Sequence, residues 1–283
     1  MTWADSARWL EDAGYSTVFL PDHFDEGFGP IAAMATAAAV TTELKVGSLV
    51  FDCDFRHPAV LAREIATIDQ LSNGRVELGV GAGWKSSDYK FSGIPMDPPG
   101  VRVSRMIESV QVLRGLLGQG EFSFHGKFFN IENLDGTPEP HTPGGPPLLI
   151  GAGAPRMLRY AGANADIVGI NPSIHSGEID EAAARDAQVD RIDQKVGWVR
   201  EGAGERFDDL ELNAWLAVAE ITDDAKAIAD VLAPTFGATP DALLDSPMVM
   251  LGTIGELAEQ IEFRRERWGY SYHVIPGDSV ESF

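Results

Sequence analysis

Short runs of aliphatic and β-branched residues alternate with helical periods along most of the chain, and this alternation constrains the fold more than any other feature. The runs have the length of buried strands. Strands that alternate with helices indicate βα units around a parallel sheet. We expect strands at residues 17–20, 44–51, 76–80, 148–150, 167–170, 212–219 and 270–275, and helices at residues 3–13, 30–40, 58–73, 101–117, 155–163, 180–200, 222–232 and 254–268.

The length of the chain favours a closed sheet. Its 283 residues are close to the roughly 250 of a typical (β/α)8 TIM barrel, and the elements are evenly spaced. A doubly wound open sheet is the alternative. A barrel of this kind opens with a strand, whereas this chain opens with a helix at residues 3–13. We therefore expect a barrel of seven strands that lacks the first one, and we favour a natural start upstream of Met1. The alternative is a seven-stranded variant whose gap is covered by a partner or by the C-terminal segment.

One segment interrupts the alternation. In residues 120–146, two phenylalanine pairs flank a short polar stretch, and a connector rich in proline and glycine follows. This pattern predicts a β-hairpin followed by a loop. No other stretch has the composition of a linker, so we predict one domain over residues 1–283 with a hairpin insertion around residues 120–146.

The charge of the chain excludes several classes of partner. The sequence has 22 Lys and Arg residues against 43 Asp and Glu residues, a net charge of −21. Nucleic acids and anionic membranes bind basic surfaces, so neither is expected as a partner. The single cysteine, Cys53, and the six scattered histidines offer no metal-ligand spacing. We expect a cytoplasmic enzyme with a small-molecule substrate, no metal, and a homodimer as one option for its assembly.

Two glycine-rich segments follow predicted strands and lead into helices. One contains Gly81, Gly83 and Trp84, and the other runs from Gly151 to Arg156. Glycine lets backbone N–H groups approach a ligand, and a helix N-terminus favours an anion. The functional interpretation is a phosphate site of a nucleotide-like cofactor, and the structural alternative is a pair of tight turns with a solvated arginine. In a barrel, both segments lie at the carboxyl ends of strands, where catalytic residues occur.

His23 follows Asp22 directly at the end of a predicted strand. A histidine at this place can donate to a cofactor ring or act as an acid or base. The alternative is a histidine that caps a helix or satisfies a polar group in the core. Trp84 offers a flat face for stacking or closes the barrel mouth. Asp52 and Asp54 are candidates for binding a substrate cation or for capping the helix that begins near residue 58.

Several motifs together resemble one known family. Residues 71–84, with the sequence LSNGRVELGVGAGW, resemble the central motif of the bacterial luciferase-like monooxygenase superfamily. Residues 18–24, 55–58, 150–153 and 165–169 match further motifs in the family's order. The resemblance covers nearly the whole chain. It is closest to actinobacterial oxidoreductases that use the deazaflavin coenzyme F420, and enzymes that use flavin mononucleotide (FMN) are near relatives.

The resemblance implies a (β/α)8 barrel with the cofactor ring across its C-terminal mouth. It also implies a non-proline cis peptide bond, which maps to Ser48–Leu49, and a phosphate near residues 151–156. Dehydrogenases of this branch that act on sugar phosphates carry a glutamate where this chain has Trp84, so their substrate is not carried over. His23 is the expected catalytic residue, and the expected cofactor-binding residues are Asp22, Ser48, Leu49, Gly81, Gly83, Trp84, Gly151, Ala152, Gly153, Ala154 and Arg156.

Three functions are consistent with the resemblance. The first is an F420-dependent oxidoreductase that transfers a hydride between the deazaflavin and a small organic substrate. The second is a two-component monooxygenase that binds reduced FMN and oxygen. The third is a flavin-binding barrel protein without turnover.

Overall fold

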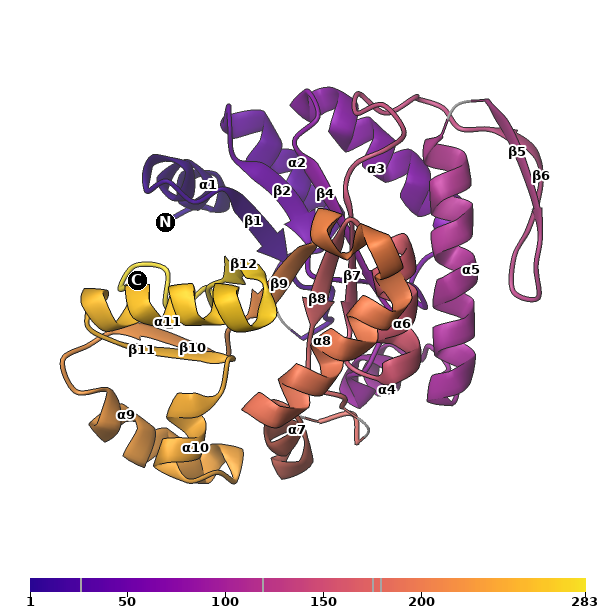
Figure 1. Ribbon diagram of the computed structural model, residues 1–283. Helices are drawn as coiled ribbons and strands as arrows, with labels where there is room; N and C mark the ends of the chain where they lie inside the picture. The colour runs from indigo at the N-terminus through magenta and orange to yellow at the C-terminus, as the bar shows by residue number, and fades with distance from the viewer. Residues whose placement is uncertain (26, 119, 175, 179) are drawn as a thin grey trace. The chain divides into compact units, whose positions relative to one another are not determined.

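The protein is described by a computed structural model that covers residues 1–25, 27–118, 120–174, 176–178 and 180–283 (Figure 1). Contacts within the chain divide it into two compact units, Met1–Leu149 and Ile150–Phe283, which we call the N-terminal unit and the C-terminal unit. Each unit is described on its own below.

The N-terminal unit is built from parallel strands that alternate with helices. Its sheet has the order β1-β2-β4, and the short β3 pairs with β4 in parallel. The helices pack on one another in chain order, α1 on α2, α2 on α3 and α3 on α5. The elements are α1 (Trp3–Asp12), β1 (Thr17–Leu20), α2 (Pro30–Val40), β2 (Lys45–Ser48), β3 (Phe51–Asp52), α3 (Pro58–Ser72), β4 (Val76–Gly81), α4 (Ser86–Ser92), α5 (Pro99–Leu117), β5 (Glu121–His125) and β6 (Asn130–Asp135).

The helices of this unit begin where the sequence supplies start signals. Thr2 and Asp5 form a capping box at α1, in which each side chain accepts from the other residue's backbone N–H. Pro30 and Pro58 stand at the first helical turn, where the missing N–H of proline costs nothing. His57 accepts from the Ala59 N–H and so caps α3, which gives this histidine a structural role.

The predicted hairpin is present. Strands β5 and β6 pair antiparallel with Glu121 opposite Asp135 and His125 opposite Asn130. Figure 1 shows the hairpin beside α5, and the backbone N–H groups of Lys127 and Phe128 at its turn donate to Glu108 of this helix. Gly115 on α5 makes room for it, because a Cβ at this glycine would lie 2.1 Å from the Phe122 ring.

The C-terminal unit continues the alternation. Strand β7 begins at the last two residues of the N-terminal unit, and the order β7-β8-β9-β12 follows, with β9 parallel to both β8 and β12. The elements are β7 (Leu148–Ala152), α6 (Pro155–Asn164), β8 (Ile167–Ile170), α7 (Glu181–Asp186), α8 (Val189–Ala203), η1 (Gly204–Asp209), β9 (Glu211–Trp215), β10 (Val218–Ile221), α9 (Ala225–Leu232), η2 (Ala233–Phe236), α10 (Pro240–Asp245), β11 (Val249–Gly252), α11 (Ile254–Trp268) and β12 (Tyr270–Val274).

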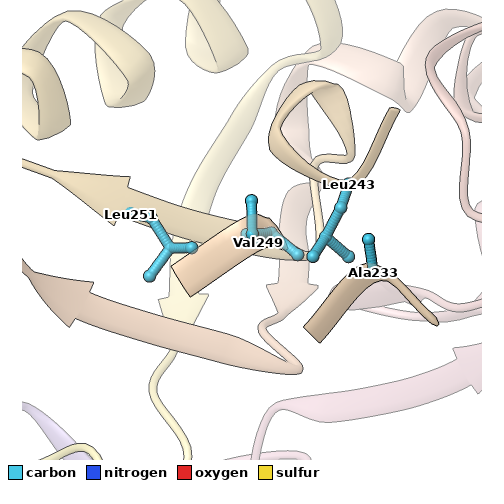
Figure 2. Close-up of a cluster of buried hydrophobic side chains, with 5 residues drawn as sticks. Ala233, Leu243, Val249 and Leu251 are labelled. Atoms are coloured by element: carbon cyan, nitrogen blue, oxygen red, sulfur yellow. The ribbon is translucent and has the colours of Figure 1, made fainter. Parts of the chain in front are cut away.

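Strands β10 and β11 form a separate parallel pair within the C-terminal unit. Their apolar residues pack against α9, η2 and α10. Figure 2 shows Ala233 of η2 and Leu243 of α10 beside Val249 and Leu251 of β11. This small cluster explains one difference from the sequence analysis. The predicted strand 212–219 is two strands, because its first half pairs with β12 and its second half pairs with β11.

Three further differences concern segments with weak sequence signals. The predicted helix 180–200 is interrupted at Ala187 and Gln188, which separate α7 from α8. The strand predicted at residues 44–51 is interrupted between Ser48 and Phe51. The helices α4 and α10 and the strand β11 were not predicted, because each is only four to seven residues long and carries too few residues to show a period.

The seven predicted strands are all present in the described residues as β1, β2, β4, β7, β8, β9 and β12, with helices between them. The α/β class is therefore confirmed. Across the described part of the chain, no helix combines the length and the hydropathy that crossing a bilayer requires.

Candidate functional site

His23 lies just after β1, in the N-terminal unit, and its imidazole is bound to a carboxylate from α4. The distance between His23 Nδ1 and Asp88 Oδ2 is 2.6 Å. The other carboxylate oxygen of Asp88 accepts from the Phe24 N–H at 3.0 Å. The Trp84 ring meets the imidazole edge-on, with centroids 5.6 Å apart and planes at 87°. The imidazole is thus held by a hydrogen bond and by a ring contact, and it remains 20% exposed.

Asp22 has a different environment from its neighbour. It is buried, and its carboxylate forms an ion pair with the Arg56 guanidinium. Asp22 Oδ2 also accepts from the backbone N–H of Asp52 at 3.0 Å. These contacts link the end of β1 to the end of β3, so Asp22 stabilises this part of the fold. Its role in cofactor binding stays a prediction.

A second carboxylate group surrounds the Tyr89 hydroxyl. Tyr89 Oη lies 2.9 Å from Asp52 Oδ2 and 3.0 Å from Asp54 Oδ2. Asp54 also pairs with Arg105 at 2.5 Å. Burial raises the pKa of Asp52 to about 7, and the nearby carboxylates of Asp54 and Asp22 add to this effect. The two aspartates therefore do not cap the helix at residue 58, which His57 caps.

The glycines after β4 serve close packing in this unit. Gly83 has a φ of +71°, and a Cβ there would lie 1.9 Å from Tyr89 Oη and 2.3 Å from Asp52 Oδ2. A Cβ at Gly81 would lie 2.6 Å from the Val50 side chain. Both positions therefore need glycine because of neighbouring protein atoms.

The residues predicted around the cis bond lie at the end of β2. The Ser48 side chain is fully buried, and its hydroxyl donates to the Leu20 carbonyl at 2.9 Å. Leu49 is half-buried, and its N–H donates to the same carbonyl. The non-proline cis peptide bond joins Leu49 to Val50 and not Ser48 to Leu49, so the predicted position was wrong by one residue.

The other predicted loop belongs to the C-terminal unit, where it joins β7 to α6. Helix α6 begins with Pro155 after Ala154, and no side chain caps its N-terminus. Ala152 accepts from the Asn171 N–H at 2.8 Å. A Cβ at Gly153 would lie 2.7 Å from the Pro172 carbonyl oxygen, so this glycine allows the loops after β7 and β8 to touch. Gly151 lies in β7, and Arg156 is exposed in the first turn of α6.

A buried lysine, which the sequence analysis did not select, holds these two loops. The Lys195 ammonium donates to the Gly153 carbonyl at 2.6 Å, to the Asn171 carbonyl at 3.0 Å and to Asp186 Oδ2 at 2.6 Å. Its side chain is 1% exposed. Burial lowers the pKa of Lys195, and the hydrogen bond with Asp186 opposes this effect. All three protons of the ammonium have acceptors.

The predicted residues thus fall into two sets. The N-terminal unit brings His23 to Trp84, and Asp22 and Gly83 to Asp52. The C-terminal unit holds Gly151, Ala152, Gly153, Ala154 and Arg156 at the end of β7 and the start of α6. Asp88, Tyr89 and Lys195 were not predicted. Asp88 and Tyr89 lie in a polar stretch without a period, and Lys195 is one charged residue of a charged helix, so no local signal separates them.

Known proteins share both motifs and fold with this chain. The luciferase-like monooxygenase family matches residues 3–196. The F420-dependent glucose-6-phosphate dehydrogenase of Amycolatopsis mediterranei is 33% identical over 164 residues, which cover 55% of this chain and 49% of that protein. The 4-hydroxyprotoasukamycin monooxygenase of Streptomyces nodosus subsp. asukaensis is 27% identical over 304 residues, which cover 94% of this chain and 78% of that protein.

A solved structure extends the likeness to the fold. The coenzyme F420-dependent tetrahydromethanopterin reductase from Methanopyrus kandleri matches with a TM-score of 0.77 at 20% identity, over 99% of this chain and 91% of that one. The fold class is therefore the predicted α/β barrel of the luciferase-like type. Because the family match covers more than half of its length, the chain belongs to the luciferase-like monooxygenase family.

Proposed function

We propose that the protein is an F420-dependent oxidoreductase that transfers a hydride between the deazaflavin and a small organic substrate. The observation that carries the proposal is the His23–Asp88 pair at the carboxyl end of β1, with an imidazole that is held in place and still 20% exposed. A barrel enzyme carries its chemistry at this end of its strands. The similarity to an F420-dependent dehydrogenase supports the choice of cofactor.

The residues of the β7–α6 loop fit the phosphate of such a cofactor. The N-terminus of α6 has no side-chain cap, and an uncapped helix N-terminus presents N–H donors and a partial positive charge to an anion. Arg156 is exposed in the first helical turn and adds a full positive charge. We infer that Gly153, Ala154 and Arg156 would hold the phosphate.

When bound, the deazaflavin would supply the site that accepts or donates the hydride. His23 would exchange the accompanying proton with the substrate through its imidazole, which balances the charge of the hydride transfer. Trp84 contacts His23 and would form a wall of the substrate site. Trp84 carries no acid or base, so in this mechanism the proton is exchanged by His23.

An FMN-dependent monooxygenase is the second candidate. The similarity to 4-hydroxyprotoasukamycin monooxygenase, which spans 94% of this chain, favours it. FMN and F420 share a tricyclic ring system and a phosphate, so the same loop residues suit both. A flavin-binding protein without turnover ranks third, because it gives no role to the His23–Asp88 pair.

Equilibrium titration of the purified protein with each cofactor tests the proposal. We expect F420 fluorescence to change in a saturable way and FMN fluorescence to change little at the same concentrations. Saturable binding of FMN without binding of F420 would overturn the choice of F420 and favour the monooxygenase. Binding of neither cofactor would contradict both candidates.

A further inference from the structure

We propose that Asp88 is a positioning residue that determines which imidazole nitrogen of His23 carries a proton, and that it leaves Nε2 as the atom that accepts the substrate proton. The inference rests on the proposed function, in which His23 exchanges a proton with the substrate. It adds a residue that none of the sequence motifs contains.

The two oxygens of the Asp88 carboxylate each face one nitrogen. Oδ1 accepts from the Phe24 N–H at 3.0 Å, and Oδ2 lies 2.6 Å from His23 Nδ1. An ionised carboxylate has only acceptors, so a close nitrogen must act as the donor. The proton of a neutral His23 ring therefore resides on Nδ1, and Nε2 carries the lone pair.

The two side chains of the pair differ in their exposure to solvent. The Asp88 side chain is 3% exposed, whereas the His23 side chain is 20% exposed. Asp88 is thus out of reach of a substrate, and His23 is not. The edge-on contact with Trp84 restrains the plane of the imidazole. With Nδ1 bound to Asp88, Nε2 is the ring nitrogen left to meet a substrate.

The Asp88 carboxylate is held in a fixed position. Asp88 belongs to α4, and the next residue, Tyr89, is buried with its hydroxyl between Asp52 and Asp54. The Phe24 N–H fixes the carboxylate from the other side. A side chain that is fixed by a neighbour on its own helix and by a backbone donor can set the orientation of its partner.

The variant Asp88→Asn gives a sharp test, because asparagine keeps the shape and reverses one contact. Its amide oxygen would still accept from the Phe24 N–H, so its amide nitrogen would face His23 Nδ1 as a donor. Nδ1 must then be the acceptor, and the ring proton must move to Nε2. We expect turnover to fall about 100-fold or more, the usual contribution of a general base, with F420 affinity changed less than about twofold.

The tautomer can be measured without cofactor or substrate. Long-range ¹H–¹⁵N correlation spectra at about pH 8, where an ordinary histidine is neutral, distinguish the two tautomers. The His23 signals are assigned as those absent from His23→Gln, since the chain has six histidines. We expect the Nδ1–H form in the native protein and the Nε2–H form in Asp88→Asn.

Asp25→Asn is the matched control, because Asp25 lies in the same loop and pairs with Lys85 at 2.8 Å. It should leave the tautomer and turnover unchanged. An Nε2–H form in the native protein, or the same tautomer in native protein and Asp88→Asn, would overturn the inference. Failure to bind either cofactor would overturn the proposed function without changing the tautomer result, so the two failures are distinguishable.

Discussion

The two units hold the residues at their strand ends in different ways. In the N-terminal unit, carboxylates bind other side chains: Asp88 binds His23, and both Asp52 and Asp54 bind the Tyr89 hydroxyl. In the C-terminal unit, one ammonium binds backbone carbonyls, because Lys195 donates to Gly153 and Asn171. The first arrangement places reactive side chains, and the second fixes the path of the backbone.

This difference has a chemical consequence. Asp52 has a pKa of about 7 and therefore changes its charge near neutral pH. The carbonyls that Lys195 binds do not titrate, and Asp186 keeps its charge near neutral pH because hydrogen bonds with Lys195 and Ser173 outweigh burial and hold its pKa low. Near neutral pH, the network of the N-terminal unit should respond to protons, and that of the C-terminal unit should not.

The largest expected effect comes from breaking the network of the C-terminal unit. Lys195→Met removes the donor for two carbonyls and the more deeply buried of two basic partners of Asp186, which keeps its ion pair with Arg191. Removing one partner of a buried ion pair costs about 3–5 kcal/mol. We expect a loss of this size in the free energy of unfolding, measured by urea denaturation, with little dependence on pH between about pH 6 and 8.

Lys226→Met is the control for this variant. Lys226 pairs with Asp230 at 2.9 Å on the surface of α9, with both side chains more than half exposed. Surface pairs contribute little, so this variant should unfold like the native protein. Equal losses in the two variants would show that the Lys195 network does not stabilise the unit.

The second expected effect concerns the network of the N-terminal unit and its response to pH. The Tyr89 hydroxyl lies near two carboxylates but can donate its single proton to only one of them. A protonated Asp52 can donate to the hydroxyl oxygen, so that both contacts are hydrogen bonds. Because folding raises the pKa of Asp52 from 3.8 to about 7, its contribution to stability is fully present below about pH 4 and disappears as the pH rises through 7.

Asp52→Asn imitates the protonated side chain and should remove this dependence. Between about pH 5 and pH 8, the free energy of unfolding of the native protein should fall by roughly 2–3 kcal/mol, as the pKa shift of Asp52 implies. The variant should not show this fall. Urea denaturation at several pH values measures it. Parallel stability curves for the two proteins would mean that Asp52 is ionised throughout. Asp25→Asn, which alters a half-exposed carboxylate, is the control.

The smallest expected effect on the free energy of unfolding comes from Arg156→Ala, since Arg156 is exposed. Its consequence should appear in binding. A charge-assisted hydrogen bond contributes about 1.5–3 kcal/mol, so the affinity for F420 should fall roughly ten- to a hundredfold at unchanged stability. Arg159→Ala, on the same helix and paired with Glu201 at 2.7 Å, should leave the affinity unchanged. An unchanged affinity in Arg156→Ala would remove this residue from the phosphate site.

The sequence predicts the strands well because each is a short apolar run with a clear end. It fails for strand 212–219, where the apolar run continues through the point at which pairing changes from β12 to β11. Pairing of that kind depends on residues far away in the chain, which a local pattern does not contain.

For the candidate site, the sequence predicts individual residues but not their partners. His23 is found because it stands close to the end of a predicted strand, where a barrel carries its chemistry, but its partner Asp88 is 65 positions away. The glycines after β4 and β7 are also found, yet the reason for Gly83 and Gly153 is contact with Tyr89 and Pro172, which only the folded chain provides. Residue type and position in the strand pattern are local properties, whereas a hydrogen-bond partner is a property of the tertiary structure.

Helix α4 links the contact with His23 to the contact with the Asp52–Asp54 pair. Asp88 and Tyr89 are consecutive residues of one seven-residue helix, and they contact His23 on one side and the Asp52–Asp54 pair on the other. Any displacement of α4 changes both contacts together. We expect a ligand that moves His23 together with α4 to alter the surroundings of Asp52 as well, and a binding enthalpy that varies with the ionisation heat of the buffer would reveal this coupling.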